Sequence, residues 1–178
     1  AHTLYRIGSE GMELKNEVTN NSGLETIARV GQSFRLPAAF DTLTWYGKGP
    51  WETYADRKDA ALIGLYTSSV AEQHVPFAVP CECGGHEDTR FAALSDGTHT
   101  VQIVGSDDFH FSALPYSIAE YRKATYEEEL PEQTTGTWLI LDVAHAGLGG
   151  DTGWTKNIHP EYRVCKGRYS YTFRFHFA

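Results

Sequence analysis

The residues "RYSYTFRFHF", Arg168–Phe177, carry the clearest secondary-structure pattern of the chain. Aromatic residues occupy every second position, and polar or charged residues lie between them. Successive side chains of a β-strand point to opposite faces of a sheet, so this period of two predicts a strand with one buried aromatic face. The predicted buried face comprises Tyr169, Tyr171, Phe173, Phe175 and Phe177.

Alternation of apolar and polar residues recurs near the start of the chain. "TLYRIGSEGMELKNEV" is typical of a β-hairpin that turns at Ser9, Glu10 and Gly11. "ETIARVGQSFRLP" predicts a further strand, which Pro37 would end. Its apolar face would comprise Ala28, Val30, Phe34 and Leu36.

Short strands are also predicted for "TLTWYG", "AALIGLY", "HTVQIVG" and "FHFSAL". Turn signals recur about every ten residues, at "NNSG", "GKGP", "SDG", "GSDD" and "CKG". "GTWLILDVAHAG" is apolar on both faces, so residues 137–144 should form a central strand that is covered on both sides. Together these patterns predict an all-β fold of antiparallel strands, as a sandwich or barrel.

One helix is predicted in "YSIAEYRKATYEEEL". Ser117 would be its N-cap, Glu120 would complete a capping box, and Pro131 would end it. The acidic run Glu127, Glu128 and Glu129 is interpreted as a solvated face near the end of this helix.

The composition is that of one globular domain. The chain has 178 residues and a formal net charge of −8. Its basic residues are scattered, which argues against nucleic acid or an anionic membrane as partners. No apolar run approaches the roughly 20 residues that span a bilayer, and "AHTLYRIGSE" does not resemble a signal peptide. We therefore expect a cytoplasmic location.

Three cysteines, Cys81, Cys83 and Cys165, are a poor basis for a disulfide framework. "CECGGH" contains three possible zinc ligands, namely Cys81, Cys83 and His86. A structural zinc site needs four ligands, and a fourth is not evident in the sequence. A reduced loop is the favoured interpretation, and metal binding at these three residues is left open.

Motifs that would carry chemistry are missing from the sequence. No G-x-S-x-G elbow, H-E-x-x-H motif or Walker A lysine occurs. Hydrolysis of a glycoside normally needs two carboxylates that flank the scissile bond, and no acidic residue lies in a setting that argues for a raised pKa. We therefore assign no catalytic residue to this chain.

The stretch "HAGLGGDTGW", residues 145–154, follows the predicted central strand. It lacks the lysine of a phosphate loop and the spacing of a dinucleotide-binding turn. His145 and Asp151 could ligate a metal, although two residues are weak evidence. The glycines more readily shape a rigid loop, which would hold Trp154 as a platform for a sugar or fold it onto the core.

Four segments together resemble the C-terminal domain, or small-chain domain, of family 2 β-galactosidases. They are "LTWYGKGPWETYADRKDAALIGLY", "FAVPCECGGHEDTRFAALSDG", "FHFSALPYSIAEYRKATYEEEL" and "GTWLILDVAHAGLGGDTGW", in the order of that family. The motifs "GPWETYADR" and "GLGGDTGW" are specific. One departure is Cys83-Gly84-Gly85-His86, where the family usually has Asn-Gly-x-Arg, so an arginine role is in doubt there.

The resemblance implies an antiparallel super-sandwich, similar to galactose mutarotase, with residues 1–178 as an incomplete copy that lacks the first strands. It implies that the catalytic glutamates lie in a separate TIM-barrel domain. In this chain it implies substrate-binding roles for Trp154 and Asp151, and loop-shaping roles for Gly147, Gly149 and Gly150.

The same resemblance implies partners and cofactors. The partners would be the remaining domains or large chain of the enzyme, a galactoside such as lactose, and further copies in a homo-oligomer. Magnesium and sodium are expected in the full enzyme, with their main ligands in other domains and no metal site in this chain.

Two other classes of function are kept as alternatives. One is a free-standing carbohydrate-binding or mutarotase-like module, in which His145 or His110 would act as the general acid beside a glutamate base. The other is a purely structural interaction module.

Overall fold

The computed structural model describes residues 1–21, 23–132, 134, 136–149 and 157–178. Over this range the chain is built almost entirely of antiparallel strands, which confirms the all-β prediction. The strands are β1 His2–Gly8, β2 Gly11–Thr19, β3 Thr26–Ile27, β4 Arg29–Leu36, β5 Thr42–Gly49, β6 Leu62–Ser69, β7 Gly85–Ser95, β8 Thr100–Leu114, β9 Thr137–His145, β10 Val164–Cys165 and β11 Arg168–Phe177. The helical elements are α1 Ile118–Lys123 and the 3-10 turns η1 Ala71–Gln73, η2 Glu127–Glu129 and η3 Pro160–Tyr162.

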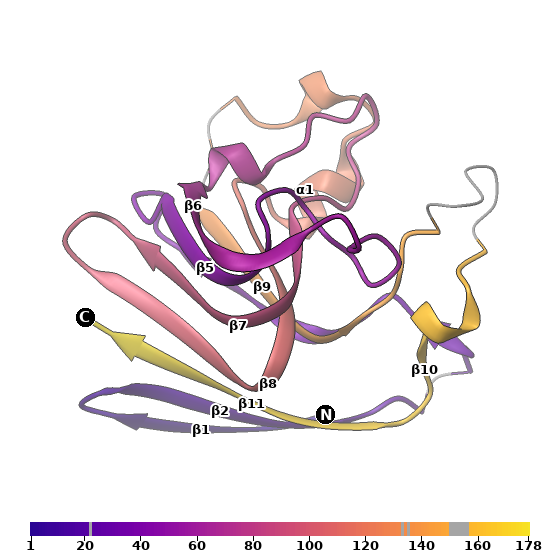
Figure 1. Ribbon diagram of the computed structural model, residues 1–178, viewed down its shortest axis with the longest axis horizontal. Helices are drawn as coiled ribbons and strands as arrows, with labels where there is room; N and C mark the ends of the chain where they lie inside the picture. The colour runs from indigo at the N-terminus through magenta and orange to yellow at the C-terminus, as the bar shows by residue number, and fades with distance from the viewer. Residues whose placement is uncertain (22, 133, 135, 150–156) are drawn as a thin grey trace.

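The main sheet branches at its longest strand, β8. Its strand order is β1-β2-β11-β8-β7-β5-β6, with β9 also paired to β8 and β4 paired to β9. The first part of β8 pairs with β11, and residues 110–114 pair with β9. β8 therefore belongs to both parts of the sheet, which bend around the core as Figure 1 shows.

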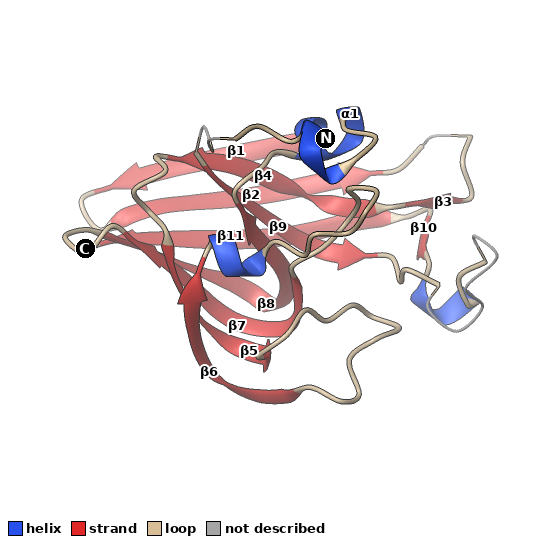
Figure 2. Cartoon of the chain, turned by 90° about the horizontal axis from the view of Figure 1, so that it is seen from above, coloured by secondary structure: helices blue, strands red, loops and turns tan. Residues whose placement is uncertain are grey.

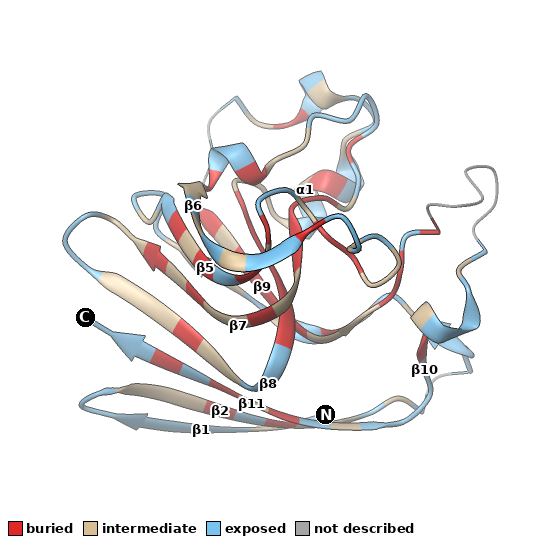
Figure 3. Ribbon diagram, viewed as in Figure 1, coloured by how far each residue is buried: buried red, intermediate tan, exposed pale blue. Residues whose placement is uncertain are grey.

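The core lies between strands that are not hydrogen-bonded to each other. Phe34 on β4 meets Phe175 on β11 edge to face, with ring centroids 5.0 Å apart. Tyr171, Phe173 and Phe175 are buried, as the period of two predicts, and Figure 3 shows the buried positions alternating along the strands. Phe177 is an exception to the prediction, because it is the last residue of β11 and lies exposed at the rim of the sheet.

The predicted central strand is confirmed as β9, which lies between β4 and β8. Residues 139–142 are all buried, although their side chains alternate between the two faces of the sheet. This explains why the segment lacks the alternation of a half-exposed strand.

Two predictions for the strands are wrong in detail. "HTVQIVG" and "FHFSAL" are one strand, and the expected turn "GSDD" at residues 105–108 is a bulge within β8. Thr89 pairs with Phe109 and Phe91 with Val104, so β8 has extra residues where β7 has one. Ala28 is exposed between β3 and β4 rather than part of the buried face, and the pairing of β4 with β9 shifts after Val30.

The predicted helix begins where expected and ends early. Ser117 and Glu120 form the capping box of α1. The backbone becomes extended at Ala124, well before Pro131, and a separate 3-10 turn follows. Glu127 in this turn is half-buried, because His74 binds its carboxylate with Nε2 and Oε1 2.7 Å apart. The solvated-face interpretation is therefore wrong for Glu127 and holds for its two exposed neighbours.

The helical elements lie outside the strands, as Figure 2 shows. Within the described part of the chain, no helix is long and apolar enough to cross a membrane. β3 and β10 form a separate two-stranded sheet at one end of the molecule, and η3 lies beside it. Residues 146 and 147, which follow β9, also lie at this end, where Gly147 donates its N–H to the carbonyl oxygen of Tyr162.

Candidate functional site

The side chain of Asp56 holds the glycine-rich turn that follows β9. Leu148 donates its backbone N–H to Asp56 Oδ1 at 3.0 Å, and Gly149 donates to Oδ2 at 2.6 Å. Asp56 belongs to the segment "GPWETYADR" between β5 and β6. The two most specific motifs of the sequence, more than 90 residues apart, therefore meet at one carboxylate.

Two of the predicted loop-shaping glycines lie where another residue would fit poorly, one for lack of space and one for its backbone conformation. A Cβ atom at Gly147 would lie 2.5 Å from Cγ of Asp56, so a side chain there would collide with the carboxylate. Gly149 has a φ of +75°, in the left-handed region that favours glycine. Gly150, Asp151 and Trp154 lie outside the described residues, so their assigned roles stay predictions.

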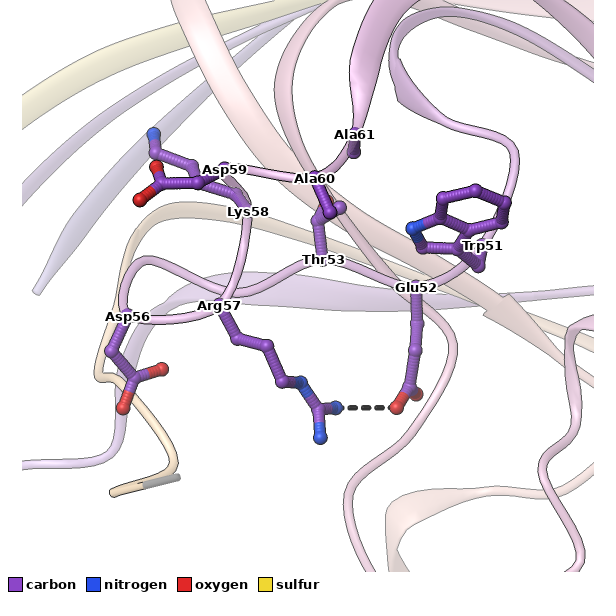
Figure 4. A pocket seen from close by; sticks show the side chains of 9 residues that line it. All are labelled: Trp51, Glu52, Thr53, Asp56, Arg57, Lys58, Asp59, Ala60 and Ala61. Carbon is purple, nitrogen blue, oxygen red and sulfur yellow. Dashed lines mark hydrogen bonds and ion pairs between the residues drawn. The ribbon is translucent and has the colours of Figure 1, made fainter. Parts of the chain in front are cut away.

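The loop that carries Asp56 surrounds a cavity of about 460 Å³. Figure 4 shows Arg57 directed toward its ion-pair partner Glu52, and the Asp56 carboxylate lying apart from that pair, on the other side of Arg57. Trp51 lies exposed at the other side of the cavity. The Arg57 guanidinium also lies over the ring of Tyr54, 5.3 Å from its centroid. Arg57 thus holds the loop through its contacts with Glu52 and Tyr54, and the Asp56 carboxylate binds the turn at Leu148 and Gly149.

A larger cavity, of about 860 Å³, lies beside the same turn. Its walls come from residues 24–29, Glu82, α1, residues 145–148, and Asn157, Ile158 and Arg163. Arg29, Glu82 and His145 contribute polar groups, whereas Ile118 and Ile158 contribute apolar surface. A cavity of this size with a few convergent polar groups has the character of a ligand site.

Two carboxylates share one arginine beside this cavity. Arg29 binds Glu82 with Nη2 and Oε1 2.9 Å apart, and its Nε lies 3.4 Å from Oδ2 of Asp142. Asp142 is fully buried and also contacts Nδ1 of His110 at 3.3 Å. Removing a carboxylate from water is costly unless it is paired, and Arg29 provides a pairing cation for both acids.

His145, whose role the sequence left open, lies within this charged cluster. Its Nδ1 is 2.7 Å from the carbonyl oxygen of Ala146, and its Nε2 is 3.7 Å from Oε1 of Glu82. Burial alone would raise the pKa of Glu82, but His145 and the Arg29 guanidinium outweigh burial and hold that pKa below its usual range. Glu82 is therefore a stabilised carboxylate and not a proton donor.

His110, Asp142 and His145 place possible metal ligands within 4.8 Å of one another. The rings of the two histidines are stacked, however, with centroids 4.4 Å apart and an interplanar angle of 31°. Magnesium and sodium prefer oxygen ligands, so this cluster does not fit either of the expected metals. Arg29 already supplies the positive charge that the carboxylates need.

The possible zinc ligands do not assemble either. The ring nitrogens of His86 lie 3.2 Å from the Lys48 carbonyl oxygen and 2.5 Å from Oε1 of Gln73. Cys83 is buried with its thiol 3.7 Å from the Tyr121 hydroxyl, whereas Cys81 is exposed. Burial raises the pKa of the Cys83 thiol, which disfavours the thiolate that zinc requires.

The mutarotase-like alternative also finds little support. His110 and His145 do lie near a glutamate, Glu82. A general acid and a general base must face a sugar between them, but His145 and Glu82 face each other, and the side chains of both histidines are at most 4% exposed.

Sequence reasoning missed the residues that organise this region, namely Asp56, Arg29 and Glu82. Asp56 and Glu82 both lie in segments that carry the family resemblance. Those segments indicated the region of the site, but they did not single out these two residues. In the sequence, Arg29 occupies one of the polar positions of an alternating strand, which gives no sign of a special role. Its position opposite His145 in the β4–β9 pair becomes visible only once the strands are paired.

Comparison with known proteins identifies the family of this chain. The family model described as the β-galactosidase small chain matches residues 1–175. The chain belongs to the β-galactosidase small-chain family. It is 38% identical to a β-galactosidase of Vibrio cholerae over 94% of its length, and 36% identical to one of Priestia megaterium over 96%. β-Galactosidase 2 of Enterobacter cloacae is 40% identical over 96%.

The chain spans only 16% of the length of each of these three relatives. The resemblance to the small-chain domain of β-galactosidases is thereby confirmed, and the segment corresponds to a small part of the proteins that it resembles.

Proposed function

We propose that this small-chain segment works as part of a β-galactosidase that hydrolyses terminal β-D-galactosides such as lactose. It would complete the galactoside site with the loop that bears Trp154 and Asp151, while the catalytic glutamates come from elsewhere in the protein. The observation that carries this proposal is the contact between the two family motifs, in which Asp56 holds the turn that leads to that loop.

The state of the acidic residues supports a non-catalytic role for the segment itself. Glycoside hydrolysis requires one carboxylic acid that donates a proton and a second carboxylate, on opposite sides of an open sugar site. Glu82 and Asp142 share Arg29 instead, and the pKa of Glu82 is held low. Magnesium and sodium, if the complete enzyme uses them, would be held mainly by its other parts.

Exposed apolar side chains support the proposed contacts with other parts of the enzyme or with further copies. Leu62 and Leu65 on β6 are 74% and 66% exposed, and Ile63 between them is 45% exposed. β6 lies at one end of the main sheet, so one of its backbone edges has no strand beside it within the described residues. Exposed apolar edge strands are typical of surfaces that another segment covers.

The proposal is tested with a chromogenic galactoside and two proteins, this chain alone and the complete protein that carries it. We expect turnover only by the complete protein. Trp154→Ala in that protein should raise KM by between about tenfold and a few hundredfold, because an aromatic stacking contact contributes on the order of 1–3 kcal/mol. Turnover by this chain alone above the buffer background would contradict the proposal, and so would an unchanged KM in Trp154→Ala.

The 860 Å³ cavity favours a second candidate, a free-standing carbohydrate-binding module. A calorimetric titration of this chain with galactose and lactose distinguishes it. Saturable binding to the isolated chain that Trp154→Ala leaves unchanged would favour the second candidate. Binding that requires the complete protein would favour the first.

A further inference from the structure

We propose that the cavity of about 460 Å³ beside Trp51 binds a neutral pyranose sugar, with the indole as the surface on which the sugar stacks. This site goes beyond the proposed hydrolytic function and does not depend on it. The residues that line the cavity all belong to the segment 51–61 between β5 and β6, which the structure describes throughout.

The first support is a large aromatic side chain left exposed at a cavity. Trp51 is 59% exposed. Among the described residues its indole has no ring contact and no hydrogen bond, so the ring contributes little to the folding of this chain. Figure 4 shows the indole nitrogen on the side of the ring that faces Thr53 and Ala60. Its N–H is therefore available to a molecule in the cavity.

The second support is that the walls of the cavity are anchored to the main sheet. Thr53 donates its backbone N–H to the carbonyl oxygen of Gly85 on β7 at 2.7 Å. Farther along the segment, Nζ of Lys48 donates to the carbonyl oxygens of Lys58 and Ala61 at 3.0 and 3.2 Å. The cavity is therefore formed before a ligand arrives, as is usual for small-molecule sites.

The third support is the near balance of charge around the cavity. Three carboxylates and two cations line it, namely Glu52, Asp56, Asp59, Arg57 and Lys58. Glu52 pairs with Arg57, and Lys58 pairs with Asp88 at 2.8 Å. A strongly charged ligand would therefore find little uncompensated charge of the opposite sign.

Two of these charged groups keep free hydrogen-bonding capacity. Arg57 binds Glu52 through Nη2, which leaves the N–H groups of Nε and Nη1 without a partner among the described residues. Asp59 is exposed, and its carboxylate has no hydrogen bond or ion pair within the described part of the chain. The cavity thus offers both donors and acceptors beside an apolar ring.

A pyranose sugar matches this combination. Its hydroxyl groups donate and accept hydrogen bonds, and the C–H groups of one ring face are apolar and pack on an aromatic surface. Trp51 would contact that face, while Asp59 accepts a hydroxyl proton and Arg57 donates to a hydroxyl oxygen. The volume of the cavity lies within the range of about 300–1,000 Å³ that is typical of small-molecule sites.

Two other occupants fit less well. Sites for quaternary ammonium groups surround the cation with several aromatic rings, whereas Trp51 is the one aromatic residue that lines this cavity. An exposed tryptophan can also anchor a partner protein. Such an anchor does not need a cavity with free donors and acceptors beside it, and the experiment below distinguishes it from a sugar site.

The test is a titration of the isotopically labelled chain with methyl β-D-galactopyranoside and methyl β-D-glucopyranoside, followed by NMR. We expect saturable shifts at the indole N–H of Trp51 and at the backbone N–H groups of Ala60 and Ala61. The dissociation constant should be on the order of millimolar, because one stacking contact and a few hydrogen bonds act on a small ligand.

Three variants show which side chains bind the sugar. Trp51→Ala should weaken binding by about tenfold or more, whereas Trp51→Phe should weaken it less because an aromatic face remains. Asp59→Asn should weaken it about threefold or more, because a hydrogen bond to a charged acceptor is lost. Tyr126→Ala is the matched control, since Tyr126 is 58% exposed and lies outside the cavity, and it should leave binding unchanged.

Several results would overturn the proposal. One is the absence of saturable shifts at sugar concentrations of about 100 mM. Another is a set of shifts centred on Ala146 and Ile158, which would place the sugar in the 860 Å³ cavity instead. A third is a Trp51→Ala variant that binds sugar normally but changes the oligomeric state of the complete protein, which would identify Trp51 as a protein anchor.

A second measurement applies if this chain alone lacks the dispersed spectrum of a folded protein. The complete protein is then titrated calorimetrically with methyl β-D-glucopyranoside. Trp51→Ala should remove a saturable phase of heat that Tyr126→Ala retains. Identical titration curves for the two variants would overturn the proposal.

Discussion

The imidazole of His86 packs on the indole of Trp45, with ring centroids 4.3 Å apart and an interplanar angle of 38°. Both side chains are almost fully buried. Burial lowers the pKa of His86 from 6.5 to about 3, with the hydrogen bond to Lys48 acting in the opposite direction. His86 is therefore a neutral core residue at physiological pH, at a position where the sequence had suggested a zinc ligand.

The stability of the protein should depend on pH through His86. Unfolding returns its pKa to near 6.5, so the unfolded chain takes up a proton below that pH and the folded chain does not until about pH 3. The contribution of neutral His86 is fully present above pH 6.5 and is lost as the pH falls toward 3. Within this window the free energy of unfolding should fall by about 1.4 kcal/mol per pH unit from this residue. Urea denaturation of wild type and His86→Gln at several pH values measures the difference, and identical slopes would refute the prediction.

Phe173 and Phe177 provide a matched pair on β11. Phe173 is 2% exposed and Phe177 is 56% exposed, although both belong to the predicted aromatic face. Phe173→Ala should lower the free energy of unfolding by about 3–5 kcal/mol, because it removes a buried ring and leaves a cavity. Phe177→Ala should cost less than about 1 kcal/mol. Similar denaturation midpoints for the two variants would show that the burial pattern of β11 is wrong.

Removal of Arg29 should destabilise the protein in a pH-dependent way. Arg29→Met leaves the carboxylates of Glu82 and Asp142 without their cation, which should cost about 3–5 kcal/mol at pH 7. The cost should shrink as the pH falls below about 4.5, because Glu82, whose pKa Arg29 helps to hold low, then becomes protonated and no longer needs the guanidinium. Arg90→Met is the control, since Arg90 pairs with Asp108 on the surface and should cost about 0–1 kcal/mol. A loss for Arg29→Met that does not vary with pH would indicate lost packing instead.

The capping box of α1 should contribute measurably to stability. The Ser117 hydroxyl accepts the N–H of Glu120 at 3.1 Å, and the Glu120 carboxylate accepts the N–H of Ser117 at 2.7 Å. Ser117→Ala should lower the free energy of unfolding by about 0.5–2 kcal/mol. Ser170→Ala, on the exposed face of β11, should change it by less than about 0.5 kcal/mol. Thermal denaturation of the two variants compares them, and equal melting temperatures would argue against the cap.

Local patterns predicted most of the strands because each pattern is a property of a few neighbouring residues. The aromatic alternation of β11 and the apolar run of β9 each specify how many faces of a strand are buried. Sequence patterns did not predict the bulge in β8, because "GSDD" has the composition of a turn. The pairing of the flanking residues with β7 and β11 keeps this segment within a strand. The partial burial of Glu127 was not predicted, because its partner His74 lies 53 residues away in the sequence.

The candidate site was less accessible to sequence reasoning than the fold. Gly147 and Gly149 stood out because glycine clusters after a buried strand are unusual. Asp56 did not stand out, because a single aspartate in a loop resembles many others and its partners are backbone N–H groups, which leave no residue pattern to detect.

The pairing of β2 with β11 has a consequence for the synthesis of the protein. Glu17 and Arg168 lie 151 residues apart and are joined by an ion pair between these strands. At a translation rate of about 5–20 residues per second, β2 waits roughly 8 to 30 s after leaving the ribosome before its partner is made. During that interval β1 is the strand of the described residues that covers an edge of β2, and the apolar side chain of Leu14 lacks its neighbour Phe173 on β11. The nascent chain therefore passes through a period in which the β1–β2 hairpin is open to association with other unfinished chains, and chaperone capture of this hairpin should be strongest before residues 168–177 emerge.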